Sequence, residues 1–316
     1  MVRLMLAFAA ASLVLGAGIA AASPPTPDNP AGRGNDILGV VPVQSEAHNG
    51  ARRGGGGPNL VYHGGKVLRT NRTVAIYWGP TSGFASGYSG TINQYFTDVA
   101  AASTQTDNVY AVETQYYDGT GSISYSSTFD GAIVDSSAYP SSGCTDSVAA
   151  TSVCLSDAQI RAEVAKVVGT SVPNANTTYF VFTGRGVGSC YQSGSCAFSQ
   201  YCAYHSNVTV NGVTVQYANQ PYTDTVPAAC DAGKYPNGQS TEADPTINVV
   251  SHEHRESIND PLGNAWYDNR GYEGSDKCAW NFGALLGSDY NQVINGNHYF
   301  LQQEWSNAIS GCALHS

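Results

Sequence analysis

The chain has 316 residues, and 14 lysines and arginines stand against 24 aspartates and glutamates, for a formal net charge of −10. This balance argues against a nucleic-acid or anionic-membrane partner, because both attract basic proteins. Hydrophobic residues make up 42% of the chain and charged residues only 12%. The chain can therefore bury a sizeable core beneath a polar, mostly uncharged surface.

The first 22 residues have the pattern of a secretory signal peptide. Arg3 supplies a positive start, residues 4–19 are mainly apolar, and Ala20-Ala21-Ala22 is a small-residue cleavage site before Ser23. A membrane anchor is the alternative, but the apolar run is shorter than the roughly 20 residues that a bilayer requires. We therefore expect a secreted, extracellular protein with no membrane partner.

Residues 23–57 are rich in proline, glycine, asparagine and arginine, and they end in four consecutive glycines. Such a segment cannot bury a core, so we predict a disordered linker or a pro-segment. Arg52-Arg53 within it is either a processing site or a basic turn in a flexible tail. Residues 58–316 are predicted to form a single domain.

Beyond residue 57 the expected elements mix strands with helices. β-Branched and aromatic runs predict strands at residues 73–78, 109–117, 132–134 and 178–183, and an Asn-Gly turn predicts a hairpin over residues 208–217. Apolar periodicity predicts helices at residues 91–101 and 156–168, the second starting with a capping box. Residues 299–305 fit either a strand or a helix. The predicted fold class is α+β, a mixed β-sheet packed with helices.

The eight cysteines form an even number in a chain that we expect to be exported, which favours disulfides. We predict the pairs Cys144–Cys154, Cys190–Cys196, Cys202–Cys230 and Cys278–Cys312. A cysteine zinc site is the rival interpretation, but the chain has no C-x-x-C pair to support it.

The stretch from Asp244 to Pro261 carries the most informative motif. Asp244-Pro245 is typical of a helix start, and Pro261 disfavours a helical conformation at Asp260. We therefore predict a helix of about a dozen residues, a normal length, packed on the sheet as a zincin-like active-site helix.

His252 and Glu256 lie four residues apart on this helix, so their side chains can reach a common point. His252-Glu253-x-x-Glu256 is the zincin pattern with glutamate in place of the second histidine, and a carboxylate oxygen is an acceptable zinc ligand. The pattern makes His252 and Glu256 zinc ligands and Glu253 the general base. A charged, solvated helix face is the alternative. His254 points roughly 160° away from Glu256 and is expected to pack or face solvent.

A zinc site needs a third protein ligand, and two acidic residues follow the helix at a suitable place. Glu273 and Asp276 are both candidates, and the sequence does not choose between them. Tyr267 or His205 is expected to stabilise the oxyanion. His205 is also a candidate extra ligand or, alternatively, a structural histidine in a disulfide-held loop. A serine nucleophile has no support, because the chain lacks a G-x-S-x-G motif.

Four short motifs along the chain together resemble the pattern of a known family. They are Asn59 to Leu68, Tyr77-Trp78-Gly79, Cys202-x-x-His205, and Asp260-Pro261 followed by Glu273 to Cys278. This set resembles the phosphate-induced protein 1 (EXORDIUM-like) family, and the His252-Glu253 pair resembles its bacterial secreted branch. The resemblance covers most of residues 58–312 and implies an extracellular protein.

Two functions from different classes follow. The first is a secreted, monomeric zinc-dependent hydrolase, a metallopeptidase that acts on a protein or peptide substrate. The second is a non-enzymatic extracellular or cell-wall-associated binding protein of the phosphate-induced protein 1 type. In that case the acidic and histidine side chains form a hydrogen-bond network or a calcium site.

Overall fold

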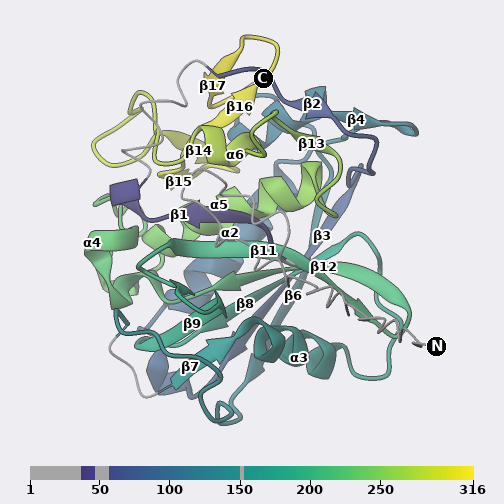
Figure 1. The fold of residues 1–316 in the computed structure, drawn as a ribbon. Helices are drawn as coiled ribbons and strands as arrows, with labels where there is room; N and C mark the ends of the chain where they lie inside the picture. The colour runs from purple at the N-terminus through teal and green to yellow at the C-terminus, as the bar shows by residue number, and fades with distance from the viewer. Residues whose placement is uncertain (1–36, 47–56, 150–152) are drawn as a thin grey trace, which may run out of the picture.

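The computed structural model describes residues 37–46, 57–149 and 153–316 (Figure 1). The expected signal peptide lies outside these residues, as do residues 23–36 and 47–56 of the expected linker. Within the described ranges, no helix has both the length and the apolar character needed to span a bilayer.

A six-stranded mixed sheet forms the centre of the fold (Figure 1). Its strand order is β1 (Ile37–Pro42), β11 (Tyr201–Val210), β12 (Val213–Gln220), β8 (Thr177–Thr183), β3 (Asn71–Trp78) and β6 (Ser127–Asp135). β1, β11 and β12 are antiparallel neighbours, whereas β12, β8, β3 and β6 run parallel. Asn211 and Gly212 turn the β11–β12 hairpin, both with positive φ, as a tight hairpin turn requires.

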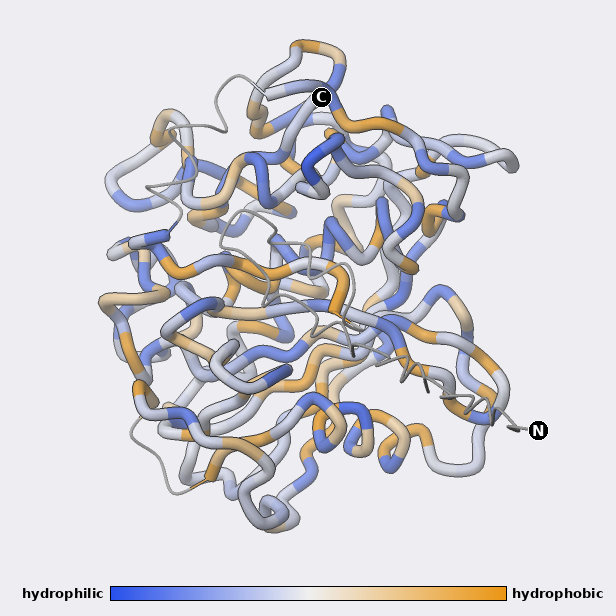
Figure 2. The backbone as a smooth tube through the Cα atoms, in the orientation of Figure 1, coloured by the Kyte–Doolittle hydropathy of each residue, from blue (hydrophilic) through white to orange (hydrophobic). Residues whose placement is uncertain are grey.

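Helices cover both faces of this sheet. Successive side chains of a strand point to opposite sides, so each central strand contributes to a core on either face. Ala75 and Tyr77 join the core under α2 (Tyr88–Ala101) and α5 (Asp244–Asn259). Ile76 and Trp78 join the core under α3 (Asp157–Val168). Figure 2 shows hydrophobic segments running through these central strands. The α+β class is therefore confirmed.

Shorter elements complete the described chain. The small strands pair as β2 (Val61–Tyr62) with β13 (Trp266–Tyr267), β4 (Tyr117–Asp118) with β5 (Gly121–Ser122), β14 (Gln292–Ile294) with β15 (Asn297–Tyr299), and β16 (Glu304–Ser306) with β17 (Gly311–Ala313). A three-stranded sheet contains β10 (Ser195–Cys196), β9 (Val187–Gln192) and β7 (Val153–Ser156). The short helices are η1 (Thr81–Gly83), η2 (Val109–Gln115), η3 (Thr223–Thr225), α4 (Pro227–Cys230), η4 (Gln239–Thr241) and α6 (Gly274–Lys277).

Most predicted elements are confirmed, and one is wrong. The strand predicted at residues 109–117 is mainly the 3-10 helix η2. The Asn108 side chain accepts a hydrogen bond from the backbone N–H of Tyr110, and Gln292 Oε1 accepts from that of Val109. These contacts satisfy the backbone in a helical turn despite β-forming side chains. The sequence did not decide between strand and helix for residues 299–305. Tyr299 is the last residue of β15, residues 300–303 lie in no element, and residues 304–305 begin β16.

The described part of the expected linker is not disordered. Residues 37–42 form the edge strand β1, with Ile37, Val40 and Val41 buried. The strand gains the backbone hydrogen bonds of the β11 edge and buries its β-branched side chains, which outweighs the polar composition around it. A pro-segment remains compatible with this arrangement, whereas a disordered linker does not hold for these residues.

All four predicted disulfides are confirmed: Cys144–Cys154, Cys190–Cys196, Cys202–Cys230 and Cys278–Cys312. Disulfides persist in oxidising compartments, so this set is compatible with an extracellular protein.

Candidate metal centre

Helix α5 is buried along its whole length. Pro245 stands in its first turn, and the helix ends at Asn259, just before Asp260-Pro261. His252, Glu253 and Glu256 on this helix are each 0% exposed. A charged, solvated face is therefore wrong for this segment. Buried ionisable groups must find partners inside the protein or lose the free energy of hydration.

Six buried ionisable side chains from three elements lie close together. They form what we call the His–carboxylate cluster: His252, Glu253 and Glu256 from α5, His205 from β11, and Glu273 and Asp276 from the start of α6. α6 is held by a capping box in which the Glu273 N–H donates to Asp276 Oδ2, at 3.1 Å. The cap fixes both acidic side chains relative to α5.

Part of the cluster, the His252 group, consists of His252, Glu256 and Asp276. His252 Nε2 lies 3.2 Å from Glu256 Oε1 and 3.5 Å from Asp276 Oδ1. Tetrahedral ligands about 2.0–2.1 Å from a zinc ion lie roughly 3.3 Å from one another. His252 Nε2 and Asp276 Oδ1 are buried, and neither makes an aligned hydrogen bond among the described residues. The three groups together can hold a metal ion.

The rest of the cluster centres on the His205 group, which consists of His205, Glu256 and Glu273. His205 Nδ1 lies 3.6 Å from Glu256 Oε2, and His205 Nε2 lies 3.9 Å from Glu273 Oε1. These three side chains also form a set that can hold a metal ion. The structure thus brings Asp276 to His252 and Glu273 to His205, so both candidate third ligands are in the cluster.

Glu253 is held by two neighbours. Its Oε1 accepts a hydrogen bond of 3.1 Å from the backbone N–H of Val41 in β1, and its Oε2 lies 2.9 Å from His205 Nδ1. Gly39, in the same strand, has no room for a side chain. A Cβ at that position would lie 2.4 Å from Glu256 Oε2 and 2.7 Å from His205 Cε1. β1 therefore closes the cluster, and glycine at position 39 permits the close approach.

Burial and neighbouring negative charge make Glu253 and Glu256 weak acids in the absence of a cation. Burial raises the pKa of Glu253 well above its ordinary value, and burial with the nearby Asp276 charge raises that of Glu256 to about 7. Burial opposes the charged form of His252, but the Glu256 carboxylate outweighs it and raises the histidine pKa well above 6.5. A bound cation reverses this balance by favouring deprotonated ligands.

Gln302 contacts the far side of the His252 ring. Its Nε2 donates to His252 Nδ1 at 2.9 Å and to the Ser275 carbonyl at 2.9 Å. Because His252 Nδ1 accepts this hydrogen bond, a neutral His252 ring carries its proton on Nε2, which faces the carboxylates. A cation at Nε2 requires that proton to move to Nδ1 and the Gln302 carboxamide to turn its oxygen toward the ring.

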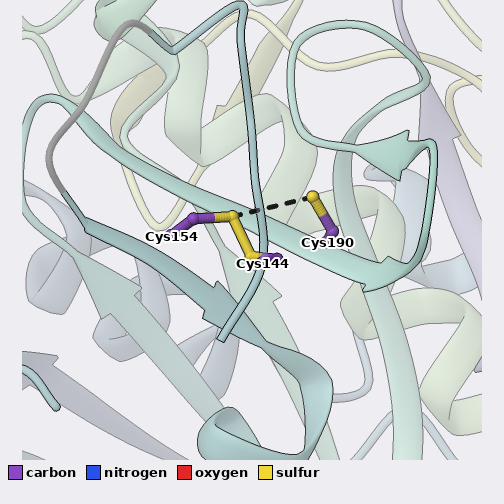
Figure 3. Close-up of side chains that lie close together, drawn as sticks. All are labelled: Cys144, Cys154 and Cys190. Carbon is purple, nitrogen blue, oxygen red and sulfur yellow. Dashed lines mark hydrogen bonds between the residues drawn. A yellow bond between two sulfur atoms is a disulfide. The ribbon is translucent and has the colours of Figure 1, made fainter. Parts of the chain in front are cut away.

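Three cysteine sulfurs also lie close enough to one another to be metal ligands, but all three are already bonded in disulfides. Cys144, Cys154 and Cys190 lie together, with Cys154 Sγ 3.6 Å from Cys190 Sγ (Figure 3). Cys144 is bonded to Cys154, and Cys190 to Cys196. Because thiolates are the metal-binding form of cysteine, the oxidised group is a pair of adjacent disulfides and not a metal site.

His254 and Tyr267 lie away from the cluster's contacts. His254 packs in the core, where its Nδ1 lies 2.9 Å from Tyr110 Oη and its Nε2 2.9 Å from Asn71 Oδ1, as a packing role predicts. The Tyr267 ring stacks on His63, with ring centroids 3.5 Å apart. Its position on the β2–β13 ribbon gives no support to the predicted oxyanion role.

Three contacts of the centre were absent from the sequence interpretation: Gly39, Val41 and Gln302. Ile37 to Val43 carries a strand-like apolar pattern, which is the signal that a search of the proline- and glycine-rich segment would use. Gln302 carries no comparable local signal. Comparison of the chain with models of known families, with curated proteins and with solved structures found no match.

Proposed function

We propose that this protein is a secreted zinc-dependent hydrolase that cleaves peptide bonds. The observation that carries the proposal is the His252 group, whose ligand atoms are spaced as zinc ligands are. His252 Nε2 and Asp276 Oδ1 are buried without an aligned hydrogen bond among the described residues, and Glu256 Oε1 accepts one from the Asp276 N–H. His252, Glu256 and Asp276 would hold the ion, which makes Asp276 the third ligand at this position. Nitrogen and carboxylate oxygen are both ordinary zinc donors.

The residues divide the chemical work between them. A bound zinc ion lowers the pKa of a water ligand toward neutrality and polarises a substrate carbonyl. Glu253 accepts the proton from water and donates it to the leaving amine. His205 holds Glu253 Oε2, which leaves Oε1 as the oxygen that exchanges the proton. In the described structure, Val41 N–H occupies Oε1.

The contacts of β1 support a peptide as the substrate class. β1 lies antiparallel to β11, and its backbone N–H reaches Glu253. An extended substrate in the same place would gain the β11 hydrogen bonds and present a leaving-group N–H to the base. On this proposal β1 belongs to a pro-segment, and hydrolysis requires its displacement.

Two substitutions test metal binding and chemistry separately. His252→Ala should lose the zinc ion of the His252 group, because it removes a nitrogen ligand. Glu253→Gln should keep zinc and lose nearly all peptide hydrolysis, since glutamine cannot accept the proton. Zinc is measured per chain by elemental analysis, and hydrolysis is measured with a peptide library after limited proteolysis of the segment before residue 58.

The result that overturns the proposal is equally direct. If wild-type protein purified with zinc contains no stoichiometric metal, the cluster is a hydrogen-bond network. The non-enzymatic extracellular protein of the phosphate-induced protein 1 type then becomes the better hypothesis. If Glu253→Gln loses zinc as His252→Ala does, Glu253 is a ligand and not the base.

A further inference from the structure

Glu256 faces two histidines that reach it from different elements. Its Oε1 lies 3.2 Å from Nε2 of His252 on α5, and its Oε2 lies 3.6 Å from Nδ1 of His205 on β11. Each oxygen thus belongs to a separate set of potential ligands. We propose that Glu256 bridges two divalent cations, with a second site formed by His205, Glu256 Oε2 and Glu273. A role of this second site in hydrolysis rests on the proposed function, whereas the binding of a second cation there does not.

The unused oxygen of Glu256 points to a ligand at this second position. Glu256 is 0% exposed, and its Oε2 makes no hydrogen bond among the described residues. A buried carboxylate oxygen without a donor loses its hydration with no compensation. Oε2 lies beneath Gly39, where a Cβ would come within 2.4 Å. A cation shared with His205 and Glu273 would supply the missing partner.

Two divalent cations match the charge of the fully ionised cluster. Glu253, Glu256, Glu273 and Asp276 carry four negative charges when ionised, and imidazole ligands bind metals in their neutral form. One divalent ion leaves a formal charge of −2 in the protein interior, whereas two ions give −4 + 4 = 0. Uncompensated buried charge is strongly unfavourable.

Neighbouring basic side chains do not supply the missing charge, because they serve other carboxylates. Buried Arg255 lies 3.1 Å from Glu304, and Lys277 lies 3.3 Å from Asp268.

His205 has a suitable arrangement for a ligand. A carboxylate, Glu253, lies 2.9 Å from its Nδ1, and its Nε2 lies on the Glu273 side. Metal-binding histidines commonly place a carboxylate on the second ring nitrogen.

Metal stoichiometry tests the second site on the full chain. Protein purified in Zn²⁺ and dialysed against metal-free buffer should contain two zinc ions per chain. Glu273→Gln and His205→Gln should each contain one, because each removes a ligand of the His205 group only. His252→Ala should also contain one, and Glu256→Gln should fall below one because it weakens both sites. His63→Gln, a change at an exposed histidine stacked on Tyr267, should keep two.

A measurement on the wild type alone avoids variants that fail to fold. Protein loaded with Mn²⁺ in place of Zn²⁺ should give an electron paramagnetic resonance spectrum of two coupled ions, since two-metal sites place the ions about 3.5–4 Å apart. An uncoupled single-ion spectrum, with one zinc per chain that survives Glu273→Gln and is lost in His252→Ala, overturns the second site and leaves the proposed function standing. No metal in the wild type overturns both.

Discussion

Two histidines two positions apart on α5 have opposite surroundings, and this difference separates a structural residue from a candidate ligand. His252 Nε2 faces two carboxylates. His254 contacts only neutral partners through its ring nitrogens, Tyr110 Oη and Asn71 Oδ1. Burial, with a smaller effect of Arg255, lowers the His254 pKa to about 3. The same burial therefore favours the neutral form at one position and is outweighed by negative charge at the other.

His254 should make the protein sensitive to mild acid. Its folded-state pKa lies below the ordinary 6.5, so its contribution to stability is present above pH 6.5 and is lost as the pH falls toward 3. Linkage gives a loss of about 3 kcal/mol in the free energy of unfolding between pH 7 and pH 4. Urea unfolding at pH 7, 5.5 and 4 measures the loss.

The matched variants are His254→Gln and His63→Gln. His254→Gln should be less stable at pH 7 but should lack this part of the acid dependence, because glutamine does not titrate. His63→Gln should keep the wild-type slope. An unchanged slope in His254→Gln would show that other groups cause the acid sensitivity.

At the scale of elements, β1 is the piece that controls access to the cluster. In Gly39→Ala the new Cβ would come within 3.0 Å of Glu256 Oε2, Glu273 Oε2 and His205 Cε1, so β1 must shift. We expect a loss of about 1–3 kcal/mol in stability and a severalfold gain in peptide hydrolysis over the unprocessed wild type. Thermal unfolding and a peptide assay measure the two effects, and zinc content shows whether the metal is retained.

Gly119→Ala is the control for β1, because a Cβ at Gly119 meets nothing within 4 Å. It should match the wild type in both assays. If Gly39→Ala matches it as well, β1 does not restrain the cluster in solution.

The elements that the sequence predicts well are those fixed by local pattern. The capping box at Ser156 and Gln159 starts α3, and Asn211-Gly212 turns the β11–β12 hairpin. β1 was missed because its short apolar pattern lies in a segment whose composition predicts disorder, and its pairing partner β11 is far away in the sequence. Likewise the spacing of His252 and Glu256 predicts their convergence, but the choice between Glu273 and Asp276 depends on how the α6 cap packs against α5.

Over the whole molecule, four disulfides and two hydrophobic cores stabilise a fold whose buried His–carboxylate cluster is unfavourable when ionised without a cation. Cys202–Cys230 joins β11 to α4, and Cys278–Cys312 joins the end of α6 to β17. β11 and α6 carry side chains of the cluster, so both elements are covalently held. A folded frame that holds carboxyl groups together is strained by their repulsion when they ionise. The stability of the whole protein should therefore depend jointly on metal and pH.

The chelator-treated protein should lose stability as the pH rises. Glu256 has a folded-state pKa of about 7 without metal, raised from 4.5 by burial and then by Asp276. A raised carboxyl pKa gives stability that is present below pH 4.5 and is lost as the pH rises through 7. Zinc requires the deprotonated ligand, so its binding strengthens over the same range. At a free zinc concentration 100 times the dissociation constant, binding adds about 2.7 kcal/mol. The gap in melting temperature between zinc-loaded and chelator-treated protein should therefore widen from pH 5 to pH 7.5. Calorimetry with the disulfides kept oxidised measures this gap, and a gap of zero at every pH would show that the cluster binds no zinc.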